Sequence, residues 1–313
     1  MNILVSGGAG YIGSVTVKQL LDEEHSVTVV DNLVKGRREL VDSRADFCEV
    51  DILDVKALDD VFSSSSFDAV VHFAAHKDAG ESMVDVPKYS ENIVGTINIL
   101  NMMVKYDVGK MVFSSSAAVY GNPKYVPIDE EHPTEPINYY GMTKLVCEQK
   151  MEWYSKVHGI VCVSLRYFNV AGDKLGYIDP NASNVIPKIL EVATGVRDKL
   201  LIFGDDYDTV DGTGVRDYID VRDLAQAHIL ALKLDSSDQI NLGTSEGTSV
   251  KELMDVMEEL CGNSINHEVV GRREGDPASL TASYDKAYKV LGWKPVYGIK
   301  DMLDSMHKAY CQK

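Results

Sequence analysis

The residues best suited to chemistry in this 313-residue chain are a tyrosine and a lysine four positions apart. Tyr140 and Lys144 fall in a segment with a helical pattern, and residues four apart on a helix project from the same face. A free tyrosine has a pKa of about 10 and is a poor base at neutral pH. A neighbouring ammonium group favours the phenolate, which would make Tyr140 a proton acceptor. The same spacing occurs by chance in many helices, so its meaning depends on what surrounds it.

A serine run and a glycine-rich segment supply that context. Ser114–Ser116 ends a predicted strand, at the edge where ligands gather in open α/β sheets. Near the start of the chain, a predicted strand is followed by a G-x-x-G-x-x-G segment that opens a helix: Gly7, Gly10, Tyr11, Ile12 and Gly13. Such glycines let the backbone turn tightly and approach a pyrophosphate at the positive end of the helix. Together these features predict an enzyme that binds a dinucleotide.

A carboxylate at the end of the second predicted strand bears on the choice of cofactor. Asp31 stands 18 residues after Gly13. There it can accept hydrogen bonds from the adenosine ribose hydroxyls, and it would repel a 2′-phosphate. Asp31 therefore favours NAD over NADP. Lys35, Arg37 and Arg38 lie close by and either cover the adenosine phosphate side or are solvated.

Short apolar runs alternate with longer amphipathic ones in the first half of the chain. The predicted strands are Ile3–Ser6, Val27–Val30, Phe47–Val50, Ala69–Phe73, Met111–Ser114 and Val161–Leu165. The predicted helices are Tyr11–Glu23, Val55–Phe62, Tyr89–Tyr106 and Tyr139–Val157. This alternation implies right-handed crossovers and a parallel, doubly wound sheet of the Rossmann type. Strands that are apolar nearly throughout fit burial on both faces.

After about Gly172 the pattern changes to helices separated by loops rich in Gly, Asp and Pro. The predicted helices there are Asn184–Thr194, Leu224–Leu234, Val250–Cys261 and Ile299–Tyr310. We therefore predict an α/β protein with two domains. Residues 1–170 would form the NAD-binding domain and residues 171–313 a smaller mixed α/β domain for the substrate. Part of 217–243 would return to the first domain.

Composition narrows the choice of partners. The chain carries a net charge of −17, and an acidic surface repels phosphate backbones and anionic lipids. Nucleic acid and membranes are therefore poor candidate partners. The N-terminal residues enter an apolar strand directly, without the pattern of a signal peptide, and no apolar run approaches membrane-spanning length. We expect a cytoplasmic protein.

The cysteines and histidines do not have the spacing of a metal site. The five cysteines are widely separated and form no C-x-x-C, which favours free thiols in a reducing compartment. His72 and His76 are four apart, but they end a strand-like run, where the two need not share a face. We predict no bound metal.

Longer motifs over essentially the whole chain give a resemblance to a known family. They are GGAGYIGS at Gly7–Ser14, VVDNL at Val29–Leu33, VVHFAA at Val70–Ala75, SSSAAVYG at Ser114–Gly121, YYGMTK at Tyr139–Lys144, LRYFNVAG at Leu165–Gly172, GDDYDTVDGTGVRDYIDVRDLA at Gly204–Ala225 and RREGD at Arg272–Asp276. On these motifs the chain resembles the extended short-chain dehydrogenase/reductase family, and most closely its members that invert C4 of a UDP-hexose.

The resemblance implies a set of cofactor residues. Asp51 and Ile52 would flank the adenine, and Tyr167 and Phe168 would sit at the nicotinamide. The other positions that would line NAD are Asn32, Phe73, Ala74, Ala75, Lys77, Asn92 and Ser114. Lys144 would bind the nicotinamide ribose and lower the pKa of Tyr140.

The resemblance also implies a site for a UDP-sugar. Ser116 would bind the sugar hydroxyl beside Tyr140, and Lys77 would also face the substrate. The UDP pocket would use Asn169, Asn184, Leu201, Phe203, Arg216, Tyr218, Arg273 and Asp276. Two arginines can neutralise a diphosphate with forked, charge-assisted hydrogen bonds. From spacing alone, Arg216 and Arg273 could instead form surface ion pairs with neighbouring acids such as Asp217 or Glu274.

The implied reaction is an oxidation and re-reduction of one carbon. Tyr140 takes the 4-hydroxyl proton while NAD accepts the C4 hydride, and the 4-keto sugar then offers its other face before hydride and proton return. Related 4,6-dehydratases carry an Asp-Glu pair where this chain has Ala117-Ala118, so water elimination would lack its acid and base. A 4-epimerase acting mainly on UDP-N-acetylhexosamine, UDP-glucuronate or UDP-pentose is the alternative. A non-catalytic NAD-binding regulator is a more distant one, because such proteins commonly lose the Tyr or the Lys.

Two positions depart from the pattern of the relatives, and the relatives also suggest an oligomeric state for this chain. Asp220 stands where a histidine is usual, and we expect little effect on the reaction class. Leu280 stands where a tyrosine or a smaller residue is usual, in a position that resembles a gatekeeper beside the C2 substituent of the sugar. Relatives are commonly homodimers that pair through four helices, for which 89–106 and 139–157 are suitable.

Leu280→Tyr should selectively reduce turnover of UDP-N-acetylgalactosamine, because a large ring at this position leaves no room for an N-acetyl group. Turnover of UDP-galactose and UDP-N-acetylgalactosamine by both proteins checks this. An equal loss on both substrates would contradict a gatekeeper role.

Overall fold

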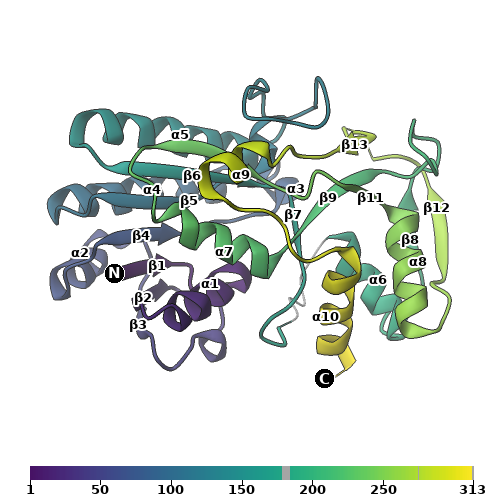
Figure 1. Cartoon of the computed structure of the whole chain (residues 1–313), viewed down its shortest axis with the longest axis horizontal. Coiled ribbons are helices and arrows are strands. Elements are labelled where there is room, and N and C mark those ends of the chain that lie inside the picture. Colours follow the sequence, from purple (N-terminus) through teal and green to yellow (C-terminus); the bar gives the residue numbers. More distant parts are fainter. Residues whose placement is uncertain (178–183, 274, 312–313) are drawn as a thin grey trace.

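A parallel sheet and the helices that flank it form the larger part of the molecule (Figure 1). The computed structural model describes residues 1–177, 184–273 and 275–311. The sheet has seven strands in the order β10-β6-β5-β4-β1-β2-β3. Their bounds are β1 Asn2–Ser6, β2 Ser26–Asp31, β3 Asp46–Glu49, β4 Ala69–His72, β5 Lys110–Ser114, β6 Val161–Tyr167 and β10 Asp238–Leu242. From β1 the chain adds strands first on one side and then on the other, so the sheet is doubly wound, as predicted.

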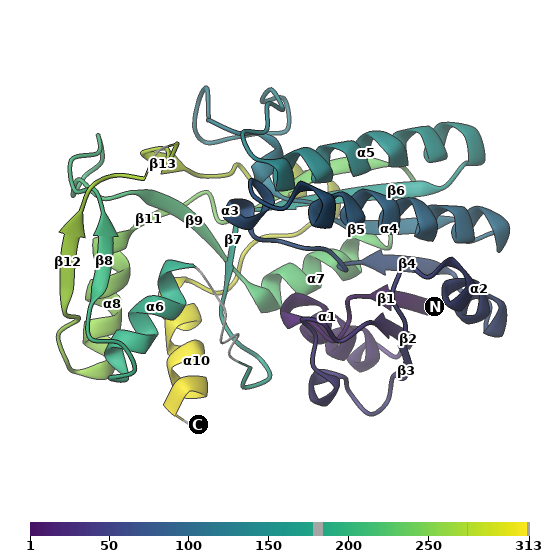
Figure 2. The ribbon, with the colours of Figure 1, turned by 180° about the vertical axis from the view of Figure 1, so that it is seen from behind.

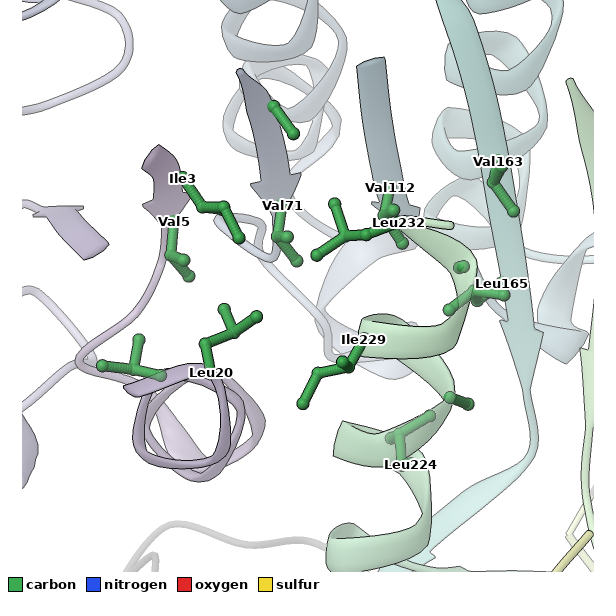
Figure 3. Close-up of a cluster of buried hydrophobic side chains, with 14 of the residues drawn as sticks. Ile3, Val5, Leu20, Val71, Val112, Val163, Leu165, Leu224, Ile229 and Leu232 are labelled. Carbon is green, nitrogen blue, oxygen red and sulfur yellow. The ribbon is translucent and has the colours of Figure 1, made fainter. Parts of the chain in front are cut away.

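Helices cover both faces of this sheet. Figure 3 shows Leu20 of α1 (Tyr11–Asp22) and Leu224 and Ile229 of α7 (Val221–Ala231) among side chains from the strands. Ile3 and Val5 belong to this cluster, whereas Leu4 belongs to the core on the other face. Successive residues of a strand point to opposite faces, so a strand that is apolar throughout serves both cores.

The second face is covered by α2 (Val55–Ser64), α4 (Val86–Lys105) and α5 (Tyr139–His158). Its core includes Phe62 of α2, Ile99 of α4 and Met151 of α5. Local sequence fixes where these helices begin. Asp54, Asp85 and Asn138 each accept hydrogen bonds from first-turn amides, and α5 ends at Gly159 with a positive φ of 73°.

The predicted elements of the first half are confirmed, each within a few residues of its predicted bounds. The largest difference is at α4, which begins three residues before the predicted Tyr89 because Asp85 caps it and Pro87 occupies its first turn. Three short elements were not predicted: η1 Arg38–Leu40, α3 Ala79–Ser82 and η2 Ala117–Val119.

The second half adds smaller sheets and three helices at the far end of the molecule (Figure 2). The helices are α6 Val185–Ala193, α8 Val250–Cys261 and α10 Ile299–Cys311, which share one core with β8 Leu200–Phe203. A four-stranded arrangement joins β7 Asn169–Ala171, β9 Val215–Asp220, β11 Gly247–Ser249 and β13 Ser279–Leu280. The strand β12 His267–Val270 pairs with β8.

The four helices predicted in this half are present, but its strands and the helix α9 (Asp285–Leu291) were not predicted. α8 matches its prediction because a capping box of Ser249 and Glu252 fixes its start. α7 begins three residues before the predicted Leu224, since Asp220 accepts a hydrogen bond from the Arg222 amide at 2.8 Å.

The chain crosses between the two regions more than once. β10 pairs in parallel with β6 in the large sheet, and α7 packs beside α1. α7 and β10 both fall inside residues 217–243. The division into domains 1–170 and 171–313 stays a prediction.

The described part of the chain contains no helix with the length and apolar character needed to cross a membrane.

The five cysteines are free. His72 is buried, with Nδ1 2.6 Å from the Ser6 hydroxyl and Nε2 3.0 Å from the Thr96 hydroxyl. Within the described residues, no group of three or more His, Cys, Asp or Glu side chains is placed to hold a metal ion.

Candidate active site

The helix α5 lies close to the chain that follows β5. A Cβ atom on Gly141 would lie 2.3 Å from the carbonyl oxygen of Ala118, so only glycine permits this approach. The Tyr140 amide also donates to the Ser82 hydroxyl at 3.0 Å. These contacts hold the first turn of α5, which carries Tyr140, against α3 and against η2, which directly follows the serine run.

The predicted catalytic residues Tyr140, Ser116 and Lys144 are brought together. The Ser116 side chain lies close enough to Tyr140 to lower the pKa of its hydroxyl, and the Lys144 Nζ atom lies 5.8 Å from the centroid of the Tyr140 ring. Nζ donates to the Ser114 carbonyl oxygen at 2.7 Å. It also lies 4.8 Å from the centroid of the Phe113 ring. The tyrosine, the serine and the ammonium group therefore share one small region at the carboxyl end of β5.

Burial dominates the proton affinities of this pair. It lowers the pKa of Lys144 from 10.5 to about 8. Burial raises the pKa of Tyr140, and the nearby Ser116 side chain only partly opposes this. In the chain alone, Tyr140 therefore keeps its proton at neutral pH. A phenolate requires further positive charge near the ring, which the oxidised nicotinamide carries.

Aromatic side chains form a wall beside the pair. The Tyr167 hydroxyl hydrogen-bonds the Ser114 hydroxyl, and burial raises the pKa of Tyr167. Phe73 lies against His228 in a tilted arrangement, with ring centroids 4.6 Å apart, and Tyr167 lies 6.0 Å from the same ring. Phe168 is buried in a cluster with Ala117. Of the residues predicted for the nicotinamide, Tyr167 therefore lies at the end of β5 beside Ser114, and Phe168 lies against Ala117 just after the serine run.

The glycine-rich turn has the form that a pyrophosphate requires. Gly7 has φ of +74°, and a Cβ atom there would lie 2.6 Å from the Ala74 amide nitrogen. Gly10, the residue before α1, provides no side-chain cap, and the first turn of α1 has no acidic residue. Its first amides, including those of Tyr11, Ile12 and Gly13, have no partner within the helix. The donor set of this turn fits NAD phosphates.

The adenosine side gathers four of the predicted residues. Asp31 is 7% exposed and accepts from the Ala9 amide at 3.0 Å and the Leu33 amide at 2.9 Å. Each carboxylate oxygen retains further acceptor capacity for a ribose hydroxyl. Asn32 donates to Asp51 at 2.9 Å. Ile52 packs against Gly95 of α4, where a Cβ atom would clash with it.

The remaining predicted cofactor residues lie on the chain after β4. Asn92 is buried and clamps this loop, accepting from the His76 amide at 2.8 Å and donating to the His76 carbonyl oxygen at 3.1 Å. In the structure Asn92 therefore supports the loop that carries Ala75 and Lys77. Both of those residues are exposed.

The two arginines predicted to bind the diphosphate lie in different segments of the second region. Arg216 of β9 reaches the Pro277 carbonyl oxygen at 2.9 Å and the Asp276 carboxylate at 3.3 Å. Arg273 lies over the Phe203 ring at 3.8 Å. Arg216 therefore does form an ion pair with an acid, but with Asp276 and not with Asp217, which is fully buried and bonds other groups. Glu274 lies outside the described residues.

The other predicted substrate residues are dispersed over this region. Asn169 donates to the Asp217 carbonyl oxygen at 3.3 Å, next to the buried Tyr218. Asn184 stands at the N-terminus of α6 without making a side-chain cap. Leu201 is exposed on β8, two residues before Phe203. Leu280 packs against the cluster of Ala117 and Phe168, which ties it to the catalytic region.

Sequence reasoning missed a buried polar network behind the catalytic helix. Glu148 accepts from the Ser115 hydroxyl at 2.5 Å and from Arg166 at 3.0 and 2.5 Å. Arg166 donates to the Tyr120 hydroxyl at 3.0 Å, which donates to Asn241 at 2.7 Å. The network joins α5 to β6 and β10. An arginine inside an apolar strand and a glutamate one turn after Lys144 were the features that could have revealed it.

With this geometry in place, comparison with known proteins gives the class. Residues 3–243 match the model of the NAD dependent epimerase/dehydratase family. The chain belongs to this family.

Particular relatives are similar over nearly their whole length. The UDP-glucose 4-epimerase of Halalkalibacterium halodurans is 47% identical over 306 residues, which are 95% of this chain and 91% of that protein. The UDP-glucose 4-epimerase of Lacticaseibacillus casei is 48% identical over 95% of this chain and 92% of that protein. A crystal structure of UDP-glucose 4-epimerase from Stenotrophomonas maltophila, with bound NAD and formylated UDP-arabinopyranose, superposes with a TM-score of 0.96 at 38% identity, covering 100% of this chain and 98% of that one.

The buried charge of Lys144 yields a prediction about stability. The folded state binds this proton more weakly than the unfolded state, whose pKa is near 10.5. At pH 7, Lys144→Met should raise the free energy of unfolding of the ligand-free protein by about 2 kcal/mol. Between about pH 8 and 10.5, only the unfolded wild-type chain holds the proton, so the wild type gains stability as pH rises and the difference should shrink.

Urea unfolding of both proteins at pH 7 and pH 10 measures this difference. Lys150→Met, an exposed lysine on the same helix, is the matched control and should change little at either pH. A Lys144→Met protein less stable than the wild type at pH 7 would contradict the prediction.

Proposed function

We propose that the chain catalyses the NAD-dependent, reversible inversion of C4 of a UDP-hexose, interconverting UDP-galactose and UDP-glucose. The observation that carries this proposal is the grouping of Tyr140, Ser116 and Lys144 at the carboxyl end of β5. The curated relatives, which carry this activity in their names, support the same function.

The work of the site divides between cofactor and protein. When bound, NAD accepts a hydride from C4 of the sugar and returns it. Tyr140 takes the proton of the 4-hydroxyl and later gives it back, through a transient 4-keto sugar. Ser116, whose side chain lies near Tyr140, would align the sugar hydroxyl with the phenol. The Lys144 charge then favours the phenolate once the positive nicotinamide lies nearby.

The substrate is held by its nucleotide, which leaves the hexose free to present either face. Arg216 and Arg273 would neutralise the diphosphate. Phe203 offers an aromatic surface and Asp276 an acceptor for ribose hydroxyls. A tether at UDP alone supports inversion, because the same Tyr140 can serve both faces of the 4-keto sugar.

Two neighbouring reaction types fit less well. Elimination of water needs an acid and a base beside Ser116, and η2 supplies only Ala117 and Ala118 there. An epimerase acting mainly on UDP-N-acetylhexosamine, UDP-glucuronate or UDP-pentose shares the catalytic residues and differs in the sugar pocket. The bound UDP-arabinopyranose derivative of the Stenotrophomonas maltophila protein favours testing a UDP-pentose first among these.

The setting and assembly of the enzyme complete the proposal. The five free cysteines support a reducing compartment, the cytoplasm. The protein would act as a homodimer that pairs through α4 and α5. Both helices expose large apolar side chains: Val94 and Val104 on α4, and Trp153 and Val157 on α5. Trp153 is 63% exposed, which is unusual for a side chain of its size unless another chain covers it.

Conversion of UDP-galactose to UDP-glucose without added NAD tests the proposed function, followed by chromatography or NMR. The wild type should convert the substrate with a retained cofactor. Tyr140→Phe, which loses only the hydroxyl, should lower kcat by at least about a hundredfold because the proton has no acceptor. Activity that appears only on adding NAD would remove the claim of a retained cofactor. Inactivity of a folded, NAD-bound wild type would reject this substrate.

Trp153→Glu should convert the homodimer to a monomer, because it places a charge in the apolar interface. Sedimentation equilibrium measures the mass of both proteins. Lys150→Glu also places a negative charge on the same helix, in exchange for a positive one, and serves as the control. A monomeric wild type, or a variant that stays dimeric, would contradict pairing through this face.

A further inference from the structure

Asp217 is a buried carboxylate in the middle of β9 and is fully shielded from solvent. One oxygen accepts from the Thr244 amide at 2.7 Å and the Thr244 hydroxyl at 2.8 Å. The other accepts from the Ser245 amide at 3.1 Å and the Ala282 amide at 3.0 Å. In the described part of the chain its partners are therefore three amides and one hydroxyl. Burial raises the pKa of this carboxyl group and the four donors oppose the rise.

These donors come from two segments that are far apart in sequence. Thr244 and Ser245 follow β10, the edge strand of the large sheet. Ala282 follows β13, which carries Leu280. The contact is close enough to require glycine, because a Cβ atom on Gly243 would lie 2.6 Å from the Asp217 carboxylate. Asp217 thus joins the large sheet, β9 and β13 at one point.

The residues flanking Asp217 in β9 face the other way, toward the substrate side. Successive side chains of a strand alternate, so Arg216 and Tyr218 point opposite to Asp217. Leu280 pairs with Arg216 across the two strands. Arg216 bonds the Pro277 carbonyl oxygen before β13, and Asp217 bonds the Ala282 amide after it. Adjacent residues of β9 therefore anchor both ends of the short strand that carries Leu280.

A third contact leaves that strand little freedom. The Ile128 amide donates to the Thr281 carbonyl oxygen at 2.8 Å, and the Ser283 amide donates to the Ile128 carbonyl oxygen at 2.7 Å. β13 is thus fixed between β9 and the chain before α5, and Leu280 faces the cluster of Ala117 and Phe168. The position of Leu280 relative to the catalytic region depends on these anchors, of which Asp217 is the fully buried one.

We infer that Asp217 is a positioning residue for substrate recognition, which fixes the strand of Leu280 against Arg216 and so sets how tightly the UDP-sugar is held. It does not touch the substrate. Its charge matters because an ionised carboxylate accepts at both oxygens, whereas an amide presents donors at one of them. This inference rests on the proposed function and deepens it.

The test is Asp217→Asn, assayed as the NAD-loaded enzyme with UDP-galactose and UDP-N-acetylgalactosamine. The amide group would face the Ser245 and Ala282 donors and push β13 away. We expect KM for UDP-galactose to rise about tenfold while kcat stays within about twofold, since Tyr140 and Lys144 are undisturbed. The UDP affinity measured by calorimetry should fall with KM, and the ratio of kcat/KM for the two sugars should change.

Asp223→Asn is the matched control. Asp223 is also a buried carboxylate that accepts backbone amides, from Val296 at 2.9 Å and Tyr297 at 3.0 Å, but it anchors the segment before α10. It should lower the unfolding temperature comparably and leave KM and the sugar ratio near those of the wild type. Equal kinetic effects of the two variants would overturn the inference.

Gly243→Ala perturbs the same anchor without changing its charge. The added methyl group would press on the Asp217 carboxylate and on Ala282, so KM should rise in the same direction. If Asp217→Asn fails to fold, the KM of Gly243→Ala for UDP-galactose tests the inference in its place. An unchanged KM would then overturn the inference. A wild type that binds UDP but does not convert UDP-galactose would count against the proposed function alone, and UDP affinity would still report on Asp217.

Discussion

Burying the Lys144 ammonium group under the carboxyl edge of the sheet is the constraint on which the site depends. A buried cation is costly unless polar groups face it. Here the Ser114 carbonyl oxygen lies 2.7 Å away, the Phe113 ring lies beneath it, and Glu148 favours the charged form. These partners sit on β5 and on the next turn of α5, so the helix must lie close against the strand. That closeness sets Tyr140 beside Ser116.

Two buried acids stabilise the framework by different means. Glu148 faces a cation, Arg166, with which it forms a two-point ion pair inside the large domain. Asp217 faces amides and a hydroxyl, where the second region meets the sheet. An ion pair links two side chains, whereas a carboxylate that accepts amides fixes backbone. The first arrangement suits the seating of a helix, and the second suits a short strand that has few hydrogen bonds of its own.

Six of the seven strands of the large sheet, all but β10, could be predicted because their determinants are local. Uninterrupted apolar strands, amphipathic helices and the glycines at Gly7, Gly10 and Gly13 each show in a few consecutive residues. The Tyr140–Lys144 pair could be found for the same reason. The Glu148–Arg166 pair and the Asp217 anchor could not, since their partners lie in distant segments of the sequence. The short strands β7, β9, β11 and β13 were missed because they owe their conformation to pairing rather than to an apolar period.

The parts of the site that we propose are built from different structural elements, and this difference would govern how specificity can change. The dinucleotide side uses backbone amides of an uncapped helix and glycines that a side chain would disrupt. The reaction side uses Tyr140 and Lys144, whose placement depends on the packing of α5. The sugar side depends on β13, a two-residue strand held at its ends by Arg216 and Asp217. A change at Leu280 can therefore alter which sugar fits while the anchors keep the strand in place. Neither the glycine turn nor α5 takes part in those anchors. A substitution of Leu280 should therefore leave the transfer of hydride and proton unaffected.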